Sequence, residues 1–308
     1  MDTNIFQTHQ KNHASDEAFA YCAAITSAHY ENFPVASLFL PEEKRPYIQA
    51  IYAFARIADD FADELKRPAE DRLRDLNEWE EKLRLCYLDS AEHPVFIALN
   101  ETVKRNNIPI EPLQNLLTAF KKDVTQNRYE TFDDLLGYCS CSANPIGRLV
   151  LMIFGHRDER LFSLSDNICT ALQLTNFWQD VAVDVQKDRL YIPIEDMTQF
   201  GYPVEKWKTG VPDENFKRLM KFQVDRTRKL FYLGAELPSL VEKELQLELK
   251  LIWFGGMSVL KRLEKIQYDV FHRRPALKWN HKLQILSRAM LTGDLARPRK
   301  RKKAWDLT

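Results

Sequence analysis

Helical periodicity is the feature that most constrains how this chain can fold. In "RLRDLNEWEEKLRLCYLD" (72–89) and "NFKRLMKFQVDRTRKLFYLGAEL" (215–237), apolar residues recur every three or four positions and charged residues fill the rest. The 308 residues include only nine glycines, and no segment alternates apolar with polar residues for long. We therefore predict an all-α fold of roughly ten helices or more, with essentially no sheet. The expected buried stripe of the first segment is Leu73, Leu76, Leu83 and Leu85.

Turn-forming segments separate these helices without dividing the chain into domains. Glycine, proline and asparagine mark such segments at 32–37, 106–112 and 200–207. No linker rich in glycine, serine or proline interrupts the sequence. We predict one all-α domain over residues 1–293, followed by a flexible tail over residues 294–308.

Charge is balanced over the whole chain but concentrated at its end. Lysine plus arginine and aspartate plus glutamate each total 44, which argues against the positive field of a nucleic-acid-binding protein. "RPRKRKK" (297–303) carries six basic residues in seven positions. This tail is either a frayed, solvated end or a peripheral contact with anionic lipid headgroups.

The cysteines and the N-terminus indicate a cytoplasmic location. The five cysteines form no CxxC pair, and a disulfide framework is not expected in a chain of this length. The N-terminal "MDTNIFQTHQKNHASDEAF" lacks the apolar core of a secretory signal. No stretch reaches the roughly 18 uninterrupted apolar residues that span a bilayer. We expect a cytoplasmic protein, at most peripheral on the inner face of the membrane.

The segment "IYAFARIADDFADELK" (51–66) places acidic residues on one face of a helix. At about 100° per residue, Tyr52, Arg56, Asp59 and Asp63 share one stripe, with Asp60 at its edge. The apolar residues on the opposite side are Ile51, Phe54, Ile57, Phe61 and Leu65. A solvated face would look similar, but like charges this close repel, and concentrated carboxylate oxygen suits a hard cation such as Mg²⁺. This segment alone leaves both interpretations open.

A second polar stripe occurs in "ALQLTNFWQDVAVDVQKDRLYIP" (171–193), where Gln173, Asn176, Asp180 and Asp184 recur at spacings of three, four and four. The apolar residues that surround the rest of this helix are Leu172, Leu174, Phe177, Trp178, Val181 and Val183. A helix that is apolar on nearly every side is expected to be buried.

Buried carboxylates have to be neutralised, paired or bound to a metal. Arg189 or Lys187 could pair with one of the acids but would not account for the whole stripe. Two acidic faces on separate helices therefore predict Mg²⁺ held between them, with substrate phosphate filling its remaining coordination sites.

The two motifs "YAFARIADDFADE" (52–64) and "QLTNFWQDVAVDVQKDRLYIP" (173–193) resemble the two aspartate-rich motifs of the squalene/phytoene synthase family. The resemblance runs from about Phe19 to Met290 and includes "YCSCSANPIGRLVL" (138–151). It implies an all-α isoprenoid-synthase helical bundle around a central apolar cavity. It also implies Mg²⁺ as cofactor, prenyl diphosphate substrates and carbocation chemistry.

The resemblance assigns roles to individual positions. The metal-binding positions are Asp59, Asp60, Asp63, Asn176, Asp180 and Asp184. The diphosphate-binding positions are His29, Arg56, Gln173, Arg189, Tyr268 and Arg273. The catalytic residues would be Asp59, Asp63, Asp180, Asp184 and Arg56. Together with Mg²⁺ they would stabilise the negative charge that develops on the departing diphosphate.

Three substitutions in the second motif indicate a branch of the family. Gln179, Ala182 and Val183 stand where many coupling enzymes have arginine, glycine and glutamate, and "HYENFP" (29–34) and "SANPIGR" (142–148) also depart from the usual pattern. These variants resemble the hydroxysqualene synthases of bacterial hopanoid pathways. Those enzymes ionise presqualene diphosphate, rearrange its cyclopropylcarbinyl cation and capture it with water. The resemblance also implies a functional partner, the presqualene diphosphate synthase that supplies the substrate.

Carbocation chemistry requires an apolar cavity with one localised polar site for the captured water. The aromatic candidates for the cavity wall are Phe33, Tyr52, Phe54, Tyr138 and Phe177. Ring faces attract cations, although plain core packing is the alternative role for each of them. The candidates for holding the water are Tyr30, Asn32, Tyr138 and Asn144.

Two alternatives remain open. The first is the coupling reaction of the family, which joins two farnesyl diphosphates to presqualene diphosphate or squalene, or two geranylgeranyl diphosphates to phytoene. It would use the same metal face. The second is a non-catalytic helical assembly or interaction protein of the same fold. Such a protein would be free to lose its acids, whereas all five of Asp59, Asp63, Asn176, Asp180 and Asp184 are present.

Overall fold

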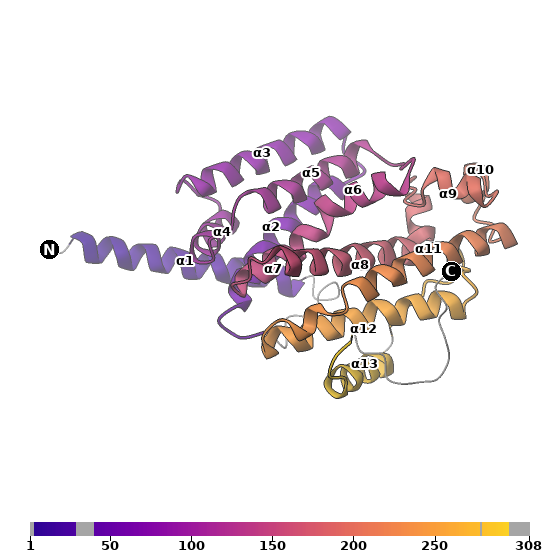
Figure 1. Cartoon of the computed structure of the whole chain (residues 1–308). Helices are drawn as coiled ribbons and strands as arrows, with labels where there is room; N and C mark the ends of the chain where they lie inside the picture. Colours follow the sequence, from indigo (N-terminus) through magenta and orange to yellow (C-terminus); the bar gives the residue numbers. More distant parts are fainter. Residues whose placement is uncertain (1–2, 29–39, 278, 296–308) are drawn as a thin grey trace.

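Helices make up the structure, a computed structural model that describes residues 3–28, 40–277 and 279–295 (Figure 1). In chain order, the helices of these ranges are α1 (Thr3–Ala28), α2 (Arg45–Asp63), α3 (Ala69–Tyr87), α4 (Pro94–Arg105), α5 (Glu111–Thr125), α6 (Phe132–Ser142), α7 (Asn144–Ile153), α8 (Glu159–Gln186), α9 (Ile194–Gln199), α10 (Val204–Thr209), α11 (Glu214–Leu233), the 3₁₀ turn η2 (Leu237–Ser239), α12 (Lys243–Lys265) and α13 (Trp279–Leu291). The only β-contact in the described ranges is an isolated bridge between Arg128 and Leu190. The all-α prediction is confirmed.

Helix α3 shows how the predicted stripes compare with the buried ones. Leu76 and Leu83 are fully buried, as predicted. The prediction was wrong for Leu85, which is 38% exposed. Trp79 and Cys86 are buried instead, because they continue the face of Leu76 and Leu83 at helical spacing.

Two predicted boundaries also need correction. Leu65 was expected on the buried side of α2 but is 49% exposed, because the helix ends at Asp63 and no helical face extends to Leu65. The turn predicted at 200–207 is helical in its second half, since α10 begins directly after Pro203. The turn at 106–112 does separate α4 from α5, whereas residues 32–37 lie outside the described residues.

Helix α8 is the central element, and its neighbours determine which of its faces is buried. Trp178 of α8 donates a hydrogen bond from its indole nitrogen to the Thr227 hydroxyl of α11 at 2.8 Å. A Cβ atom at Gly256 of α12 would lie only 2.2 Å from the Phe231 ring and 3.1 Å from Leu172 of α8, so glycine permits this close packing. Helices α6 and α7 pack against α8 as well, and Figure 1 shows α8 between them and α12.

The ends of α2 and α8 are arranged so that they face each other. Arg72 of α3, which is buried, donates to the Ala62 carbonyl in the last turn of α2 at 2.7 Å. After α8, the left-handed conformation of Asp188 (φ 52°) turns the chain back. The Arg189 amide then donates to the Asp184 carbonyl at 2.9 Å. This turn directs the Arg189 side chain toward α2.

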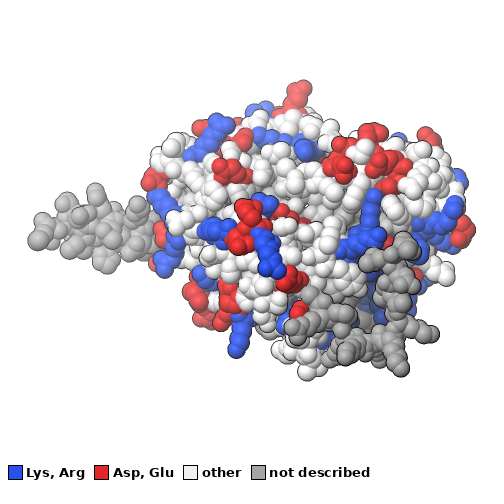
Figure 2. All heavy atoms as spheres, viewed as in Figure 1, with Lys and Arg blue, Asp and Glu red and all other residues white. Residues whose placement is uncertain are grey.

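The surface carries both signs of charge. Figure 2 shows lysine and arginine interspersed with aspartate and glutamate on the face in view, as expected from equal totals. No helix in the described part of the chain is long and apolar enough to cross a membrane. The basic tail at 297–303 lies outside the described residues, so its lipid contact and the domain boundary at 293 stay predictions.

Candidate active site

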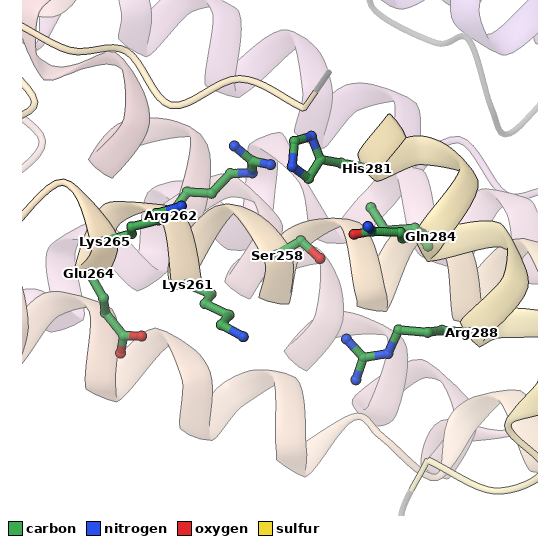
Figure 3. A pocket seen from close by; sticks show the side chains of 9 residues that line it. Ser258, Lys261, Arg262, Glu264, Lys265, His281, Gln284 and Arg288 are labelled. Atoms are coloured by element: carbon green, nitrogen blue, oxygen red, sulfur yellow. The ribbon is translucent and has the colours of Figure 1, made fainter. Parts of the chain in front are cut away.

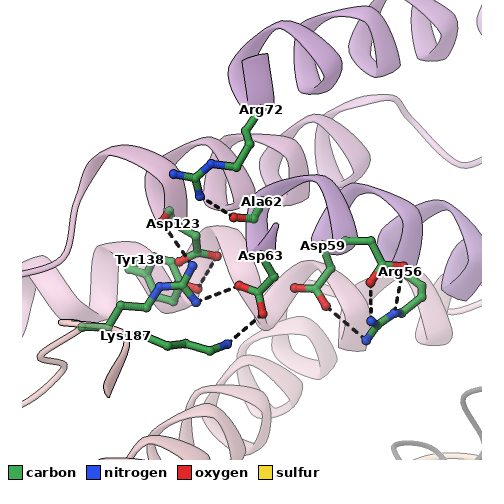
Figure 4. Close-up of polar contacts among 10 residues, drawn as sticks. Arg56, Asp59, Ala62, Asp63, Arg72, Asp123, Tyr138 and Lys187 are labelled. Atoms are coloured by element: carbon green, nitrogen blue, oxygen red, sulfur yellow. Dashed lines mark hydrogen bonds and ion pairs between the residues drawn. The ribbon is translucent and has the colours of Figure 1, made fainter. Parts of the chain in front are cut away.

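The end of α2 meets the segment that directly follows α8, and Figure 4 shows the contact between Asp63 and Lys187 there. Asp63, the last residue of α2, receives hydrogen bonds from two cations that follow α8. Lys187 Nζ donates to its Oδ2 at 3.0 Å, and Arg189 Nη1 donates to its Oδ1 at 2.8 Å. Two segments that are far apart in the sequence therefore form one polar site, as the two motifs predict.

On the α2 side, Arg56 holds the two other acids. Its guanidinium lies 3.4 Å from Asp59 Oδ2 and forms an ion pair with Asp60. Burial, and then the neighbouring charge of Asp63, raise the pKa of Asp59 to about 6, against the pull of Arg56. Burial acts on Asp63 in the same direction, but Arg189 and Lys187 prevail and lower the pKa of that carboxyl.

On the α8 side, the compensating charge is sparser. Asp180 accepts two hydrogen bonds from Arg274, at 2.6 Å from Nε and 3.2 Å from Nη2. Burial, and then the charge of Asp180, raise the pKa of Asp184 to about 7. Sequence reasoning had selected Arg273 as a diphosphate-binding residue, and in the structure its neighbour Arg274, exposed like Arg273, contacts Asp180.

The prediction that α8 is buried on every side is wrong for its C-terminal half. Asn176 is exposed, Val183 is 42% exposed and the Asp180 side chain is 31% exposed. Among the described helices, α6, α7, α11 and α12 pack against α8, while the side chains of Asn176, Asp180 and Asp184 stay exposed or partly exposed. The acidic stripe is therefore accessible, as a binding site requires.

Asp123, at the end of α5, extends the site to a third helix and was missed by sequence reasoning. Tyr138 donates from its hydroxyl to Asp123 Oδ2 at 3.1 Å, and Arg189 Nη2 lies 3.4 Å from the Asp123 backbone carbonyl. Burial raises the pKa of Asp123 to about 7, and its Oδ1 is buried without a hydrogen-bond partner. A single aspartate in "FKKDVTQ" has no spacing signal that could have identified it.

Four aromatic rings pack together beside the acidic cluster. Phe177 and Tyr191 are stacked with centroids 3.7 Å apart, and Tyr138 lies 6.0 Å from both. Tyr129 lies 5.8 Å from Tyr191. Tyr138 and Phe177 were predicted as cavity residues, whereas Tyr129 and Tyr191 were not. The R-x-Y-x-P continuation of the second motif, which contains Tyr191, was the available signal.

The remaining predicted residues are distributed more widely. Tyr52 lies on α2 near Arg56, and Gln173 is half-buried on α8. Asn144 begins α7 and accepts a hydrogen bond from Thr170 at 2.9 Å. Burial, and then Glu264 and Asp225, raise the pKa of Tyr268 to about 12, which places this residue beside the α11–α12 contact. The four residues His29, Tyr30, Asn32 and Phe33 lie outside the described residues.

Carboxylates outnumber cations in this site. The carboxylates are Asp59, Asp60, Asp63, Asp123, Asp180 and Asp184, and the cations are Arg56, Lys187, Arg189 and Arg274. In the part of the chain that the structure describes, no three His, Cys, Asp or Glu side chains are grouped closely enough to hold a metal ion in this arrangement. Their oxygens are nevertheless the donors that Mg²⁺ prefers, and burial together with a neighbouring aspartate raises the pKa of both Asp59 and Asp184, an effect that a bound cation would oppose. The donor set fits Mg²⁺ chemically, and Mg²⁺ stays a prediction.

Comparison with known proteins gives the family. The squalene/phytoene synthase family matches residues 26–281. The chain belongs to this family. Its members are enzymes that act on prenyl diphosphates, so the chain is a member of an enzyme family of isoprenoid biosynthesis. The resemblance of the two acidic motifs is thereby confirmed.

Three relatives show how the similarity is distributed. The 15-cis-phytoene synthase of Synechococcus elongatus is 30% identical over 290 residues, 89% of this chain and 93% of the relative. The hydroxysqualene synthase of Zymomonas mobilis is 40% identical over 175 residues, 56% of this chain and 57% of the relative. The crystal structure of squalene synthase HpnC from Alicyclobacillus acidocaldarius is 38% identical, with a TM-score of 0.79 over 82% of this chain and 95% of that chain.

Proposed function

We propose that this protein is a cytoplasmic hydroxysqualene synthase that converts presqualene diphosphate and water to hydroxysqualene and diphosphate. The observation that carries the proposal is the higher identity to a hydroxysqualene synthase, 40% against 30% for a phytoene synthase. The carbon–oxygen bond to diphosphate breaks, and its electron pair leaves with the diphosphate. The cation rearranges, the water oxygen bonds to carbon, and one water proton is released. A presqualene diphosphate synthase would supply the substrate.

The acidic site suits the ionisation step. Bound Mg²⁺ would act as a Lewis acid that stabilises the diphosphate. The residues that would hold the Mg²⁺ are Asp59, Asp60, Asp63, Asn176, Asp180 and Asp184. Arg56, Lys187 and Arg189 contact these acids or lie beside them, so they are placed to bind the diphosphate oxygens. Such fixed cations stabilise the charge that develops on the leaving group.

The aromatic cluster suits the cation that remains. Ring faces attract cations, and buried rings exclude water that would capture the cation too early. Tyr138 is buried in this cluster, and its hydroxyl donates to Asp123, which leaves an oxygen lone pair free to accept a hydrogen bond from water. Asn144 keeps its amide N–H groups, because its side-chain oxygen is the atom that contacts Thr170. These two are the described candidates for holding the captured water.

The second candidate function is head-to-head coupling of two prenyl diphosphates. The phytoene synthase of Synechococcus elongatus aligns with 89% of this chain, much more than the hydroxysqualene synthase does. Coupling would use the same acidic faces and would differ in the number of substrates that the cavity holds.

Product analysis separates the two functions. Purified protein is incubated with Mg²⁺ and either presqualene diphosphate or farnesyl diphosphate, without NADPH. We expect hydroxysqualene from the former and no product from the latter. Coupling of farnesyl diphosphate would show that the second candidate is correct.

A further inference from the structure

Helix α13 has two faces of different character. Ile285 and Ala289 are buried and lie on its inner face. Trp279, Leu283 and Met290 lie on another face at spacings of four and seven residues, and they are 73%, 50% and 63% exposed. Single exposed apolar residues are common, but a continuous apolar stripe on a helix usually marks a contact surface. The sequence of α13 contains no aspartate or glutamate.

A positively charged pocket of about 740 Å³ lies between α12 and α13 (Figure 3). Its charged lining residues are Lys261, Arg262, Glu264, Lys265 and Arg288. Glu264 is already ion-paired with Arg228 of α11. None of the four pocket cations forms a salt bridge with a residue in the described ranges. The pocket therefore offers uncompensated positive charge to an anionic ligand.

Contacts between α12 and α13 fix the position of the apolar stripe relative to the pocket. Lys250 of α12 donates to the Thr292 carbonyl at 2.9 Å, just after α13. The Arg288 guanidinium lies 4.8 Å from the centre of the Phe254 ring of α12. Arg288 and Gln284 point from α13 into the pocket (Figure 3), and Gln284 directly follows Leu283 of the stripe in the sequence.

We propose that α13 and the adjoining pocket form a docking surface for a bilayer that contains anionic lipids. The stripe of Trp279, Leu283 and Met290 inserts at the boundary between headgroups and acyl chains. The pocket cations bind headgroup phosphates. This surface lies within the described helices, distinct from the basic tail at 297–303, and the proposal does not rest on the proposed function.

Charge favours a lipid surface over a second copy of the chain. In a two-fold interface the same patch meets itself, so the unpaired cations beside α13 would face those of the other copy. Like charges brought together in this way oppose association. An anionic bilayer provides the complementary charge.

Vesicle binding tests the proposal with the full chain. Co-sedimentation is measured with vesicles of phosphatidylcholine alone and of phosphatidylcholine mixed with phosphatidylglycerol. We expect binding to the mixed vesicles that weakens with added salt. Leu283→Glu with Met290→Glu, and separately Lys261→Glu with Lys265→Glu, should each lower the bound fraction roughly tenfold.

The matched controls lie on and just after α3, on the opposite side of the molecule from α13 (Figure 1). Leu85→Glu with Leu88→Glu changes two exposed leucines, and Lys82→Glu with Arg84→Glu reverses two charges. Both control variants should bind mixed vesicles as the parent does. Turnover of all variants in detergent, and their circular dichroism, should match the parent, which separates docking from catalysis and folding.

Several outcomes would overturn the proposal. One is unchanged vesicle binding by both pairs of α13 and pocket variants, which would assign membrane contact elsewhere. Another is absence of binding by the parent, or a dimer that Leu283→Glu with Met290→Glu converts to a monomer. Displacement by inorganic phosphate at constant ionic strength would assign the pocket to a small free anion instead.

Discussion

The α2 end and the α8 end of the acidic site differ in how their charge is compensated. Asp63 on α2 is held by two cations from the segment after α8, and Asp59 and Asp60 share Arg56. On α8, Asp180 has one arginine, and Asp184 forms no salt bridge in the described part of the chain. Two motifs with similar sequences are therefore unequal electrostatically. Each acid of the α2 end contacts a cation of the protein, whereas Asp184 of the α8 end has no ion-pair partner among the described residues.

The largest expected effect comes from removing one acid at each end. Asp59→Asn and Asp180→Asn should each lower kcat by roughly 10³-fold or more, because each removes charge that the reaction requires at the diphosphate. Helicity by circular dichroism should not change. Glu81→Gln, at an exposed surface pair with Arg84, is the control and should retain activity. A near-native rate for either aspartate variant would show that the two ends do not form one catalytic site.

The next largest effect is on the free energy of unfolding, which should distinguish the α2 end from the α8 end. Asp63→Asn leaves Arg189, which is only 9% exposed, without its carboxylate partner. We expect a loss of about 2 kcal/mol in the free energy of unfolding, less than for a fully buried pair because Asp63 is partly exposed. Urea denaturation in metal-free buffer measures it. Stability equal to that of the parent would mean that Lys187 and Arg189 do not fix the α2 end.

The contact of Arg274 with Asp180 predicts a smaller effect on catalysis. Arg274→Ala should lower kcat/KM roughly tenfold, which corresponds to the loss of one charge-assisted contact. Arg273→Ala is the matched control and should change it less than about twofold. Gln179 donates to the Pro275 carbonyl at 2.5 Å, so Gln179→Ala should shift the kinetics in the same direction as Arg274→Ala. A larger effect at Arg273 would favour the original sequence assignment.

The smallest expected effect is a pH-dependent gain from Asp184→Asn. An unfolded aspartate has a pKa of about 4, and burial raises the pKa of Asp184 to about 7. Between these values the folded state keeps a proton that the unfolded state has lost, so this group lowers stability as pH rises. Asp184→Asn should therefore equal the parent near pH 4 and exceed it by roughly 1 kcal/mol at pH 8.

For Asp63, the contribution to stability changes with pH in the direction opposite to that of Asp184. Its lowered pKa gives stability above the unfolded pKa, and that stability is lost as pH falls through the folded value. The deficit of Asp63→Asn should therefore shrink in acid, while the gain of Asp184→Asn shrinks as well and vanishes near pH 4. Urea midpoints measured without metal across this range check both. Differences that do not vary with pH would contradict the contrast between the two ends.

Local spacing made part of the site predictable. Asp59, Asp63, Asp180 and Asp184 could be found because acids at spacings of four share a helical face. Arg189 was noted as a partner because it lies in the second motif, five residues after Asp184. Helical periodicity likewise predicted the all-α fold. It misplaced Leu85, because the leucines of this segment alone do not determine which face of the helix is buried.

The rest of the candidate site depends on tertiary contacts, which no local sequence pattern predicts. Asp123 joins the site only because α5 packs against α2 and α6, and it stands alone in its segment. The choice between Arg273 and Arg274 depends on how the chain after α12 approaches α8. The exposure of Asn176 depends on which sides of α8 the other helices cover. Composition could not show this, because apolar residues occur on nearly every side of that helix.

Isotope labelling of the product tests the central claim most directly. The protein is incubated with Mg²⁺ and presqualene diphosphate in ¹⁸O-labelled water without NADPH, and the product is analysed by mass spectrometry. We predict hydroxysqualene with one ¹⁸O atom, since water captures the cation. Hydroxysqualene without the label, or a hydrocarbon as the main product, would contradict the account.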